Sequence, residues 1–95
     1  MDLSVLFQKS KDKNQAYHAV KGQITPFYLD KWKFKVDRLD YNEETCKIYA
    51  EGKKFRLSFF FSDTSVEVEL DVSLIYRPFK ASVLSKIESE LRKVI

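Results

Sequence analysis

The sequence predicts an α+β fold, a two-layer sandwich in which two helices cover one face of a mostly antiparallel sheet. Apolar and polar residues alternate through residues 45–72, which is the period of a half-buried sheet. Helical periods precede and follow this stretch, and only two glycines and two prolines interrupt the 95 residues. The predicted element order is β-α-β-β-β-β-α, with residues 1–95 forming one domain.

Two turns, Gly52-Lys53 and Asp63-Thr64, are expected to divide residues 45–72 into three antiparallel strands. The first turn predicts the cross-strand pairs Ala50–Phe55, Ile48–Leu57 and Cys46–Phe59. The second turn predicts the pairs Phe61–Val66, Phe59–Val68 and Leu57–Leu70. Both registers place the alternating apolar residues on one side, whereas a slip of one residue would expose a whole row.

A short strand and a helix are predicted before these central strands. Residues 3–7 alternate, and a helical period follows from Ser10. Ser10 or Asp12 is the expected N-cap, and Pro26 is expected to end or kink the helix. Gly22 either marks close packing or only lowers helix stability. The expected buried stripe of this helix consists of Ala16, Tyr17, Val20, Ile24 and Phe27.

An extended segment and a closing helix complete the predicted fold. Trp32, Phe34 and Val36 are expected on one face of residues 31–41, opposite Lys31, Lys33 and Lys35. The apolar parity then changes, so either a bulge lies near Asp37-Arg38 or the strand is broken there. Residues 74–95 are predicted to be helical, with Pro78 in the first turn. The buried stripe of this helix is expected to be Phe79, Val83, Leu84, Ile87, Leu91 and Val94.

Composition places few restrictions on the partner of this chain. Seventeen Lys and Arg against fourteen Asp and Glu give a net charge of +3, which permits contact with an anionic surface without requiring it. The single cysteine, Cys46, falls on the predicted core face, so a reducing compartment is expected. Neither a secretory leader nor a membrane span is recognisable, so we expect a cytoplasmic location.

The sequence shows no recognisable catalytic or metal-binding pattern, and we expect no enzyme activity, no cofactor and no metal. The only histidine, His18, has no serine or cysteine at a suggestive spacing. Glu67, Glu69 and Asp71 align three carboxylates on one strand face, which is one way to bind a hard cation. Arg56 is predicted to lie beside Asp71, however, and Lys47 near Glu69, so ion pairing is the favoured interpretation.

Two groups of residues are candidates for binding. Tyr49 and Phe60 lie on the predicted outer face and are not explained by ion pairs, while Ile75 and Tyr76 belong to an apolar link before the closing helix. A lysine-rich group alternates with aromatic residues, as in surfaces that contact phosphates and stack on bases. This group consists of Lys31, Lys33, Lys35, Lys53 and Lys54. An edge strand protected by lysines is the plainer interpretation of its first half.

The chain resembles the small bacterial proteins of the polyhydroxyalkanoic acid system (granule-region) family over nearly its full length. The matching pieces are Trp32, the strand SVEVELDV, the link LIYRPFK and the terminal SELRKVI. The glycine that usually precedes the family's fourth strand is replaced around Lys54-Phe55, and the link is more aromatic here. The resemblance implies association with storage-polyester granules or their proteins and supplies no catalytic residues.

Three classes of function remain open. The first is a non-enzymatic accessory protein at a polyester granule, for which the apolar nature of a polyester makes Tyr49, Phe60, Ile75 and Tyr76 the candidates. The second is nucleic-acid binding through the lysine-rich group. The third is self-association, for example as a homodimer, through an edge strand or the exposed face of the sheet.

Overall fold

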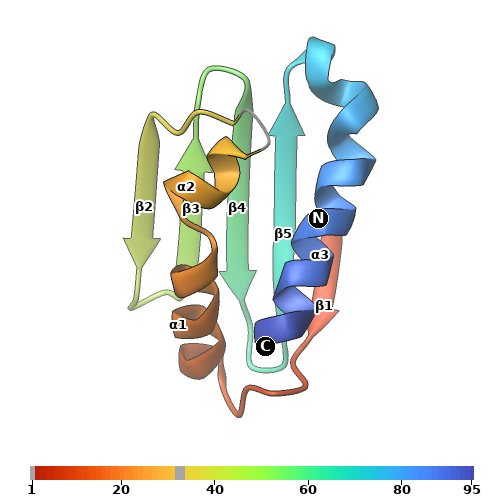
Figure 1. The fold of residues 1–95 in the computed structure, drawn as a ribbon. Coiled ribbons are helices and arrows are strands. Elements are labelled where there is room, and N and C mark those ends of the chain that lie inside the picture. Colours follow the sequence, from red (N-terminus) through yellow and green to blue (C-terminus); the bar gives the residue numbers. More distant parts are fainter. Residues whose placement is uncertain (1, 32–33) are drawn as a thin grey trace.

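Five antiparallel strands form one sheet, which the helices cover from one side (Figure 1). The computed structural model describes residues 2–31 and 34–95. The strands are β1 (Leu3–Leu6), β2 (Arg38–Asn42), β3 (Lys47–Glu51), β4 (Phe55–Phe61) and β5 (Ser65–Val72), in the spatial order β1-β5-β4-β3-β2. The helices are α1 (Lys13–Gln23), α2 (Pro26–Asp30), the 3₁₀ helix η1 (Leu74–Phe79) and α3 (Lys80–Val94). The predicted α+β sandwich is confirmed.

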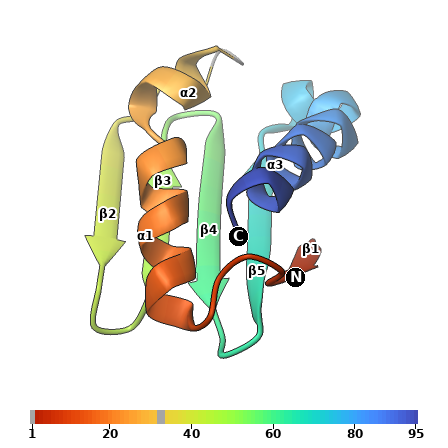
Figure 2. The same cartoon turned by 60° about the horizontal axis from the view of Figure 1, so that its bottom comes forward.

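The alternating apolar residues of the central strands face α1 and α3, and the other face of the sheet is left open (Figure 2). The ring of Tyr17 in α1 meets Phe61 of β4 edge-on, with 5.8 Å between the ring centroids. Fully burying one such large apolar side chain contributes about 1.5–3 kcal/mol. The buried residues of β4 and β5 are Phe55, Leu57, Phe59, Phe61, Val66, Val68 and Leu70.

The predicted cross-strand register is confirmed at one of the two central turns and wrong at the other. Every predicted pair across the Asp63-Thr64 turn is observed. Across the other turn the register differs by two residues, so that Ile48 faces Phe59 and Ala50 faces Leu57. The turn residues are Lys53 and Lys54, because the Gly52 N–H already donates to the Phe55 carbonyl at 3.0 Å. A shift of two residues keeps every side chain on its predicted face, which is why the alternation did not reveal it.

Gly52 is required by a close backbone approach rather than by a turn. A Cβ atom at this position would overlap the Lys35 carbonyl oxygen and would lie 2.8 Å from the Phe55 ring. The segment before β2 therefore crosses directly over Gly52, and the Asp37 N–H donates to the Glu51 carbonyl at 2.8 Å.

The predicted strand over residues 31–36 is wrong for the residues that the structure describes. Phe34 continues from the end of α2, since its N–H donates to the Leu29 carbonyl at 3.2 Å. Its side chain is buried as predicted and stacks on Phe55 at 4.6 Å. The strand begins only at Arg38, so of the two alternatives near Asp37-Arg38, a bulge or a break, the structure shows the break. Trp32 and Lys33 lie outside the described residues.

Asp12 caps α1 as predicted, since its carboxylate accepts the Gln15 N–H at 2.9 Å. Pro26 does not simply end this helix. It is the first residue of α2, whose N-cap is Thr25. The helical period of α1 is lost at this change of direction, so Phe27 is 76% exposed instead of buried. Apart from its own helix backbone, no atom of the described residues lies within 4 Å of a Cβ placed on Gly22, so the interpretation of close packing there was wrong.

The closing helix also consists of two parts. Residues 74–79 form η1, with Pro78 inside it, and α3 begins at Lys80. A 3₁₀ helix has three residues per turn, so η1 does not continue the period of α3. Phe79, predicted to be buried, is therefore 58% exposed. Val83, Ile87 and Leu91 are buried, as the stripe predicted.

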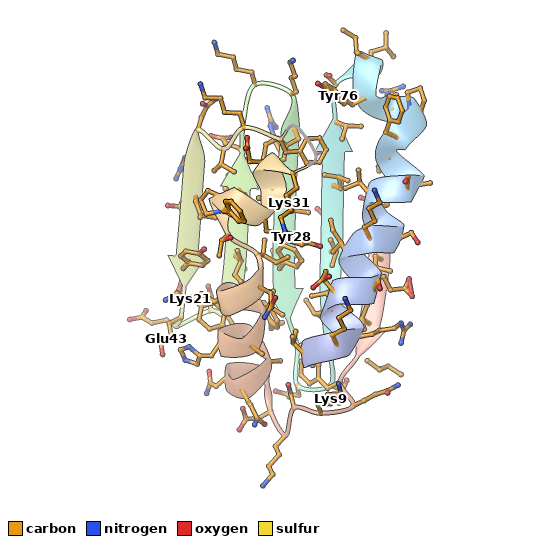
Figure 3. The ribbon with its side chains drawn as sticks, in the orientation of Figure 1. Lys9, Lys21, Tyr28, Lys31, Glu43 and Tyr76 are labelled. Atoms are coloured by element: carbon orange, nitrogen blue, oxygen red, sulfur yellow. The ribbon has the colours of Figure 1, made fainter. Side chains whose placement is uncertain are left out.

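The link between β1 and α1 closes around the end of α3. The backbone N–H groups of Gln8 and Ser10 donate to the Ile95 oxygen at 2.8 and 2.9 Å, and the Ile95 side chain is buried. Lys9, at the lower end of the molecule in Figure 3, donates to the Lys93 carbonyl at 2.8 Å. These bonds satisfy carbonyl groups that a helix end leaves without partners.

The two glycines are expected to respond to alanine in opposite directions. Gly52→Ala should destabilise the fold by about 1–3 kcal/mol, because its methyl group overlaps a backbone carbonyl. Gly22→Ala should stabilise it by about 0.5–1 kcal/mol, because the helix gains a better former and the site is open. Urea denaturation of the two variants measures both changes. Equal effects of the two substitutions would contradict this account of Gly52.

Candidate functional site

Three lysines of the predicted lysine-rich group meet at one end of the sheet. Lys35, Lys53 and Lys54 line a pocket of about 270 Å³ together with Asp37 and Phe55. They are brought together by the close approach at Gly52, which sets the Lys35 backbone against the β3–β4 turn. We call these three lysines the basic turn. Lys31 lies apart at the end of α2, and Lys33 lies outside the described residues.

The basic turn is attached to η1 through Lys54. Its backbone carbonyl accepts the Ser73 N–H at 2.9 Å. Its ammonium lies 3.4 Å from the Tyr76 hydroxyl and 5.4 Å from the centre of the Tyr76 ring. The Tyr76 ring also meets Phe34 edge-on at 6.0 Å. Tyr76, predicted as an apolar contact, is thus a half-buried aromatic residue held by a lysine and by the core.

Exposed apolar side chains are concentrated in η1. Of the five large apolar residues exposed in the described part of the chain, three belong to this six-residue helix. Leu74 is 76% exposed, Ile75 79% and Phe79 58%. We call these three residues the apolar tip. Ile75 was a predicted candidate. Leu74 and Phe79 belong to the same predicted apolar link but were not named as candidates, and Phe79 was assigned to the buried stripe of a continuous α-helix.

The other two predicted candidates lie on the open face of the sheet and have local partners. The Tyr49 hydroxyl donates to a Glu51 carboxylate oxygen at 2.7 Å, and this hydrogen bond raises the pKa of Tyr49. The Lys47 ammonium lies 5.1 Å from the centre of the Phe60 ring, its cross-strand partner. Both aromatic residues are half-buried. The four candidates therefore belong to two regions, the open sheet face and η1.

Of the two cross-strand alignments of opposite charges predicted on this face, only one is observed. Arg56 is the cross-strand partner of Asp71, as expected. The shifted register places Lys47 beside Phe60 and leaves Tyr49 aligned with Ser58 and Glu69.

The reactive side chains are dispersed within the described ranges 2–31 and 34–95. No three His, Cys, Asp or Glu residues come together there as a metal site. His18 pairs with Glu43 at 3.1 Å, and both side chains are largely exposed; Glu43 lies in the turn between β2 and β3 (Figure 3). The buried Cys46 thiol lies 3.3 Å from the Asn14 amide oxygen. Burial raises the pKa of the nearby Tyr17 hydroxyl.

No known protein-family model matches this chain, and no curated protein or solved structure is significantly similar to it. Within the residues described, no helix has both the length and the apolar character needed to cross a bilayer.

Replacing Glu51 is expected to change the titration of one tyrosine. Glu51→Gln removes the charged acceptor of the Tyr49 hydroxyl, so the pKa of Tyr49 should fall toward the usual value of about 10. The measurement is near-ultraviolet absorbance of phenolate against pH, with Tyr49→Phe identifying the component. Glu44→Gln is the matched control in a neighbouring turn. An unchanged titration in Glu51→Gln would contradict the hydrogen bond to Glu51 as the cause of the raised pKa.

Proposed function

We propose that this chain is a non-enzymatic, cytoplasmic accessory protein that binds the surface of a storage-polyester granule, or a protein on it, through the apolar tip. The observation that carries the proposal is the exposure of Leu74, Ile75 and Phe79 within a single six-residue helix. The resemblance of the LIYRPFK link to the granule-region family supports the same segment.

The apolar tip suits a polyester because such a surface offers apolar contact and only weak hydrogen-bond acceptors. Exposed apolar groups gathered in this way are typical of interaction sites rather than of ordinary surface. Full burial of one Leu, Ile or Phe side chain contributes about 1.5–3 kcal/mol. Two or three such residues contribute about 3–9 kcal/mol, which is of the same order as the cost of association, so we expect the contact of one tip to be weak and reversible.

The tip is held in place by its backbone, which limits the entropy lost on binding. The Tyr76 N–H donates to the Ser73 carbonyl, and the Ser73 N–H donates to the Lys54 carbonyl, each at 2.9 Å. These bonds fix η1 against the β3–β4 turn. Tyr49 and Phe60 are on the open sheet face and are not part of this surface.

Removing apolar surface from the tip should release the protein from granules. The double variant Leu74→Ser/Ile75→Ser is expected to bind amorphous polyester granules about tenfold more weakly or worse, because two exposed apolar contacts are lost. Sedimentation of granules with purified protein measures the bound fraction.

The matched control is Leu6→Ser/Phe27→Ser, which removes two exposed apolar residues elsewhere and should bind like the unchanged protein. Light scattering before granules are added separates granule binding from self-association through the open edges of β1 and β2. The proposal fails if the unchanged protein stays in the supernatant at every salt concentration, or if the two double variants bind alike.

Nucleic-acid binding is the second candidate, favoured by the convergence of Lys35, Lys53 and Lys54 at one pocket. The half-buried Tyr76 ring lies beside the Lys54 ammonium and is the aromatic residue that adjoins these charges, whereas Phe34 and Phe55 are buried beneath it. Lysines contacting phosphates with aromatic residues nearby are the usual elements of a single-strand binding surface.

The salt dependence of the binding affinity distinguishes nucleic-acid binding from granule binding. If the basic turn contacts phosphates, Lys53→Gln/Lys54→Gln should reduce the slope of log affinity against log salt by about 1.4, since each contact to a single strand contributes about 0.7. Lys11→Gln/Lys13→Gln, with the same charge loss, should leave the slope unchanged. Gel shift or fluorescence anisotropy with single-stranded DNA and RNA measures it. If neither the DNA nor the RNA binds at low salt, nucleic-acid binding is excluded.

A further inference from the structure

A groove lies between α2 and α3 on the helical side of the molecule. Two depressions of about 330 and 280 Å³ share Lys31 and Lys86 in their linings, so they lie next to each other along the groove. In Figure 3 the Tyr28 and Lys31 side chains lie between the two helices, with Tyr76 above them. The larger depression is lined by Phe34, Tyr76, Phe79, Val83 and Ser82 besides the two lysines. The smaller one adds Tyr28, Ser89 and Glu90.

The side of α3 that faces α2 explains why this space stays open. Ser82, Lys86 and Ser89 follow the i, i+4, i+7 spacing of one helix face, and all three line the groove. The small serine side chains leave room beside the lysine. Phe34 and Val83, which are buried, form an apolar floor at the larger end.

The groove is positively charged where its two parts meet. Neither Lys31 nor Lys86 forms an ion pair within residues 2–31 and 34–95. The one carboxylate in the lining, Glu90, is engaged by Lys93 at 3.1 Å. The Lys31 ammonium lies 5.4 Å from the centre of the exposed Phe27 ring, a contact that leaves it able to meet an anion.

We propose that this groove binds a single acyl chain ending in a carboxylate. The chain would lie on Phe34, Tyr76, Phe79 and Val83, and the carboxylate would be held by Lys31 and Lys86. A volume of about 330 Å³ is at the lower end of the range of roughly 300–1,000 Å³ found for small-molecule sites. It therefore fits one short chain and not a two-chain lipid. This binding goes beyond the granule contact and does not depend on it.

Titration of the full chain with octanoate, followed by calorimetry, tests the proposal. Octanoate should bind, and 1-octanol should bind about tenfold more weakly or worse, because it lacks the charge that the lysines recognise. Butyrate keeps the charge but loses four methylene groups, so it should bind more than about tenfold more weakly.

Two matched pairs of variants locate the site. Ser82→Phe should abolish octanoate binding by filling the apolar end, whereas Ser85→Phe, on the same helix but outside the groove, should not. Lys86→Glu should weaken octanoate binding about tenfold or more, whereas Lys13→Glu on α1 should have no effect. Thermal unfolding confirms that each variant is folded.

Several results would overturn the proposal: no heat of binding with octanoate, equal affinity for octanoate and 1-octanol, or equal octanoate binding by Ser82→Phe and Ser85→Phe. Binding of an apolar peptide through its free carboxyl end, with none of octanoate, would identify a protein partner instead. Leu74→Ser/Ile75→Ser should retain octanoate binding, because neither residue lines the groove. A failure of granule binding and a failure of octanoate binding are therefore distinguishable.

Discussion

Burial of only one face of the sheet is the constraint on which the structure depends. In β4 every second residue is a buried Phe or Leu, and β5 supplies three buried aliphatic residues beside them. With about 1.5–3 kcal/mol from each, this row is a large term in a fold whose net stability is on the order of 5–15 kcal/mol. Burying this row requires helices only on the face of the sheet from which its side chains project. The opposite face is then free for charged pairs, and the ends of the sheet are left for η1 and the β3–β4 turn.

The basic turn forms at this end of the sheet because of one backbone contact. Gly52 lets the Lys35 carbonyl pass close to β3, which moves Lys35 next to Lys53 and Lys54 and turns Phe34 onto Phe55. Like charges gathered in this way repel one another, so the basic turn is unfavourable for folding taken alone. Departures of this kind from what stability favours are expected at functional positions. The exposed apolar tip is a second departure at the same end.

The alternation of apolar and polar residues was sufficient to predict the central strands and their faces. It was not sufficient to predict the basic turn, whose residues come from separate segments of the chain. It identified the second turn and its register, because Asp63-Thr64 is bounded by unbroken alternation on both sides. It misplaced the first turn, because a glycine suggested a turn and a two-residue slip leaves the faces unchanged. Lys35 lies near Lys53 because the Lys35 carbonyl passes close to Gly52, and no sequence pattern around either residue predicts this contact. The exposure of Phe79 depends on the 3₁₀ conformation of η1, which Pro78 permits and residue periodicity does not reveal.

The apolar tip and the groove share one residue, and this relates the two proposals physically. Phe79 belongs to the tip and also lines the groove, whereas Leu74 and Ile75 belong to the tip alone. A ring that covers an acyl chain in the groove cannot at the same time be buried against a surface. If both contacts use Phe79, binding at one site lowers affinity at the other by the same factor, because such coupling is reciprocal. The direction is antagonistic, so an acyl carboxylate in the groove would favour the form of the protein that is free of the granule.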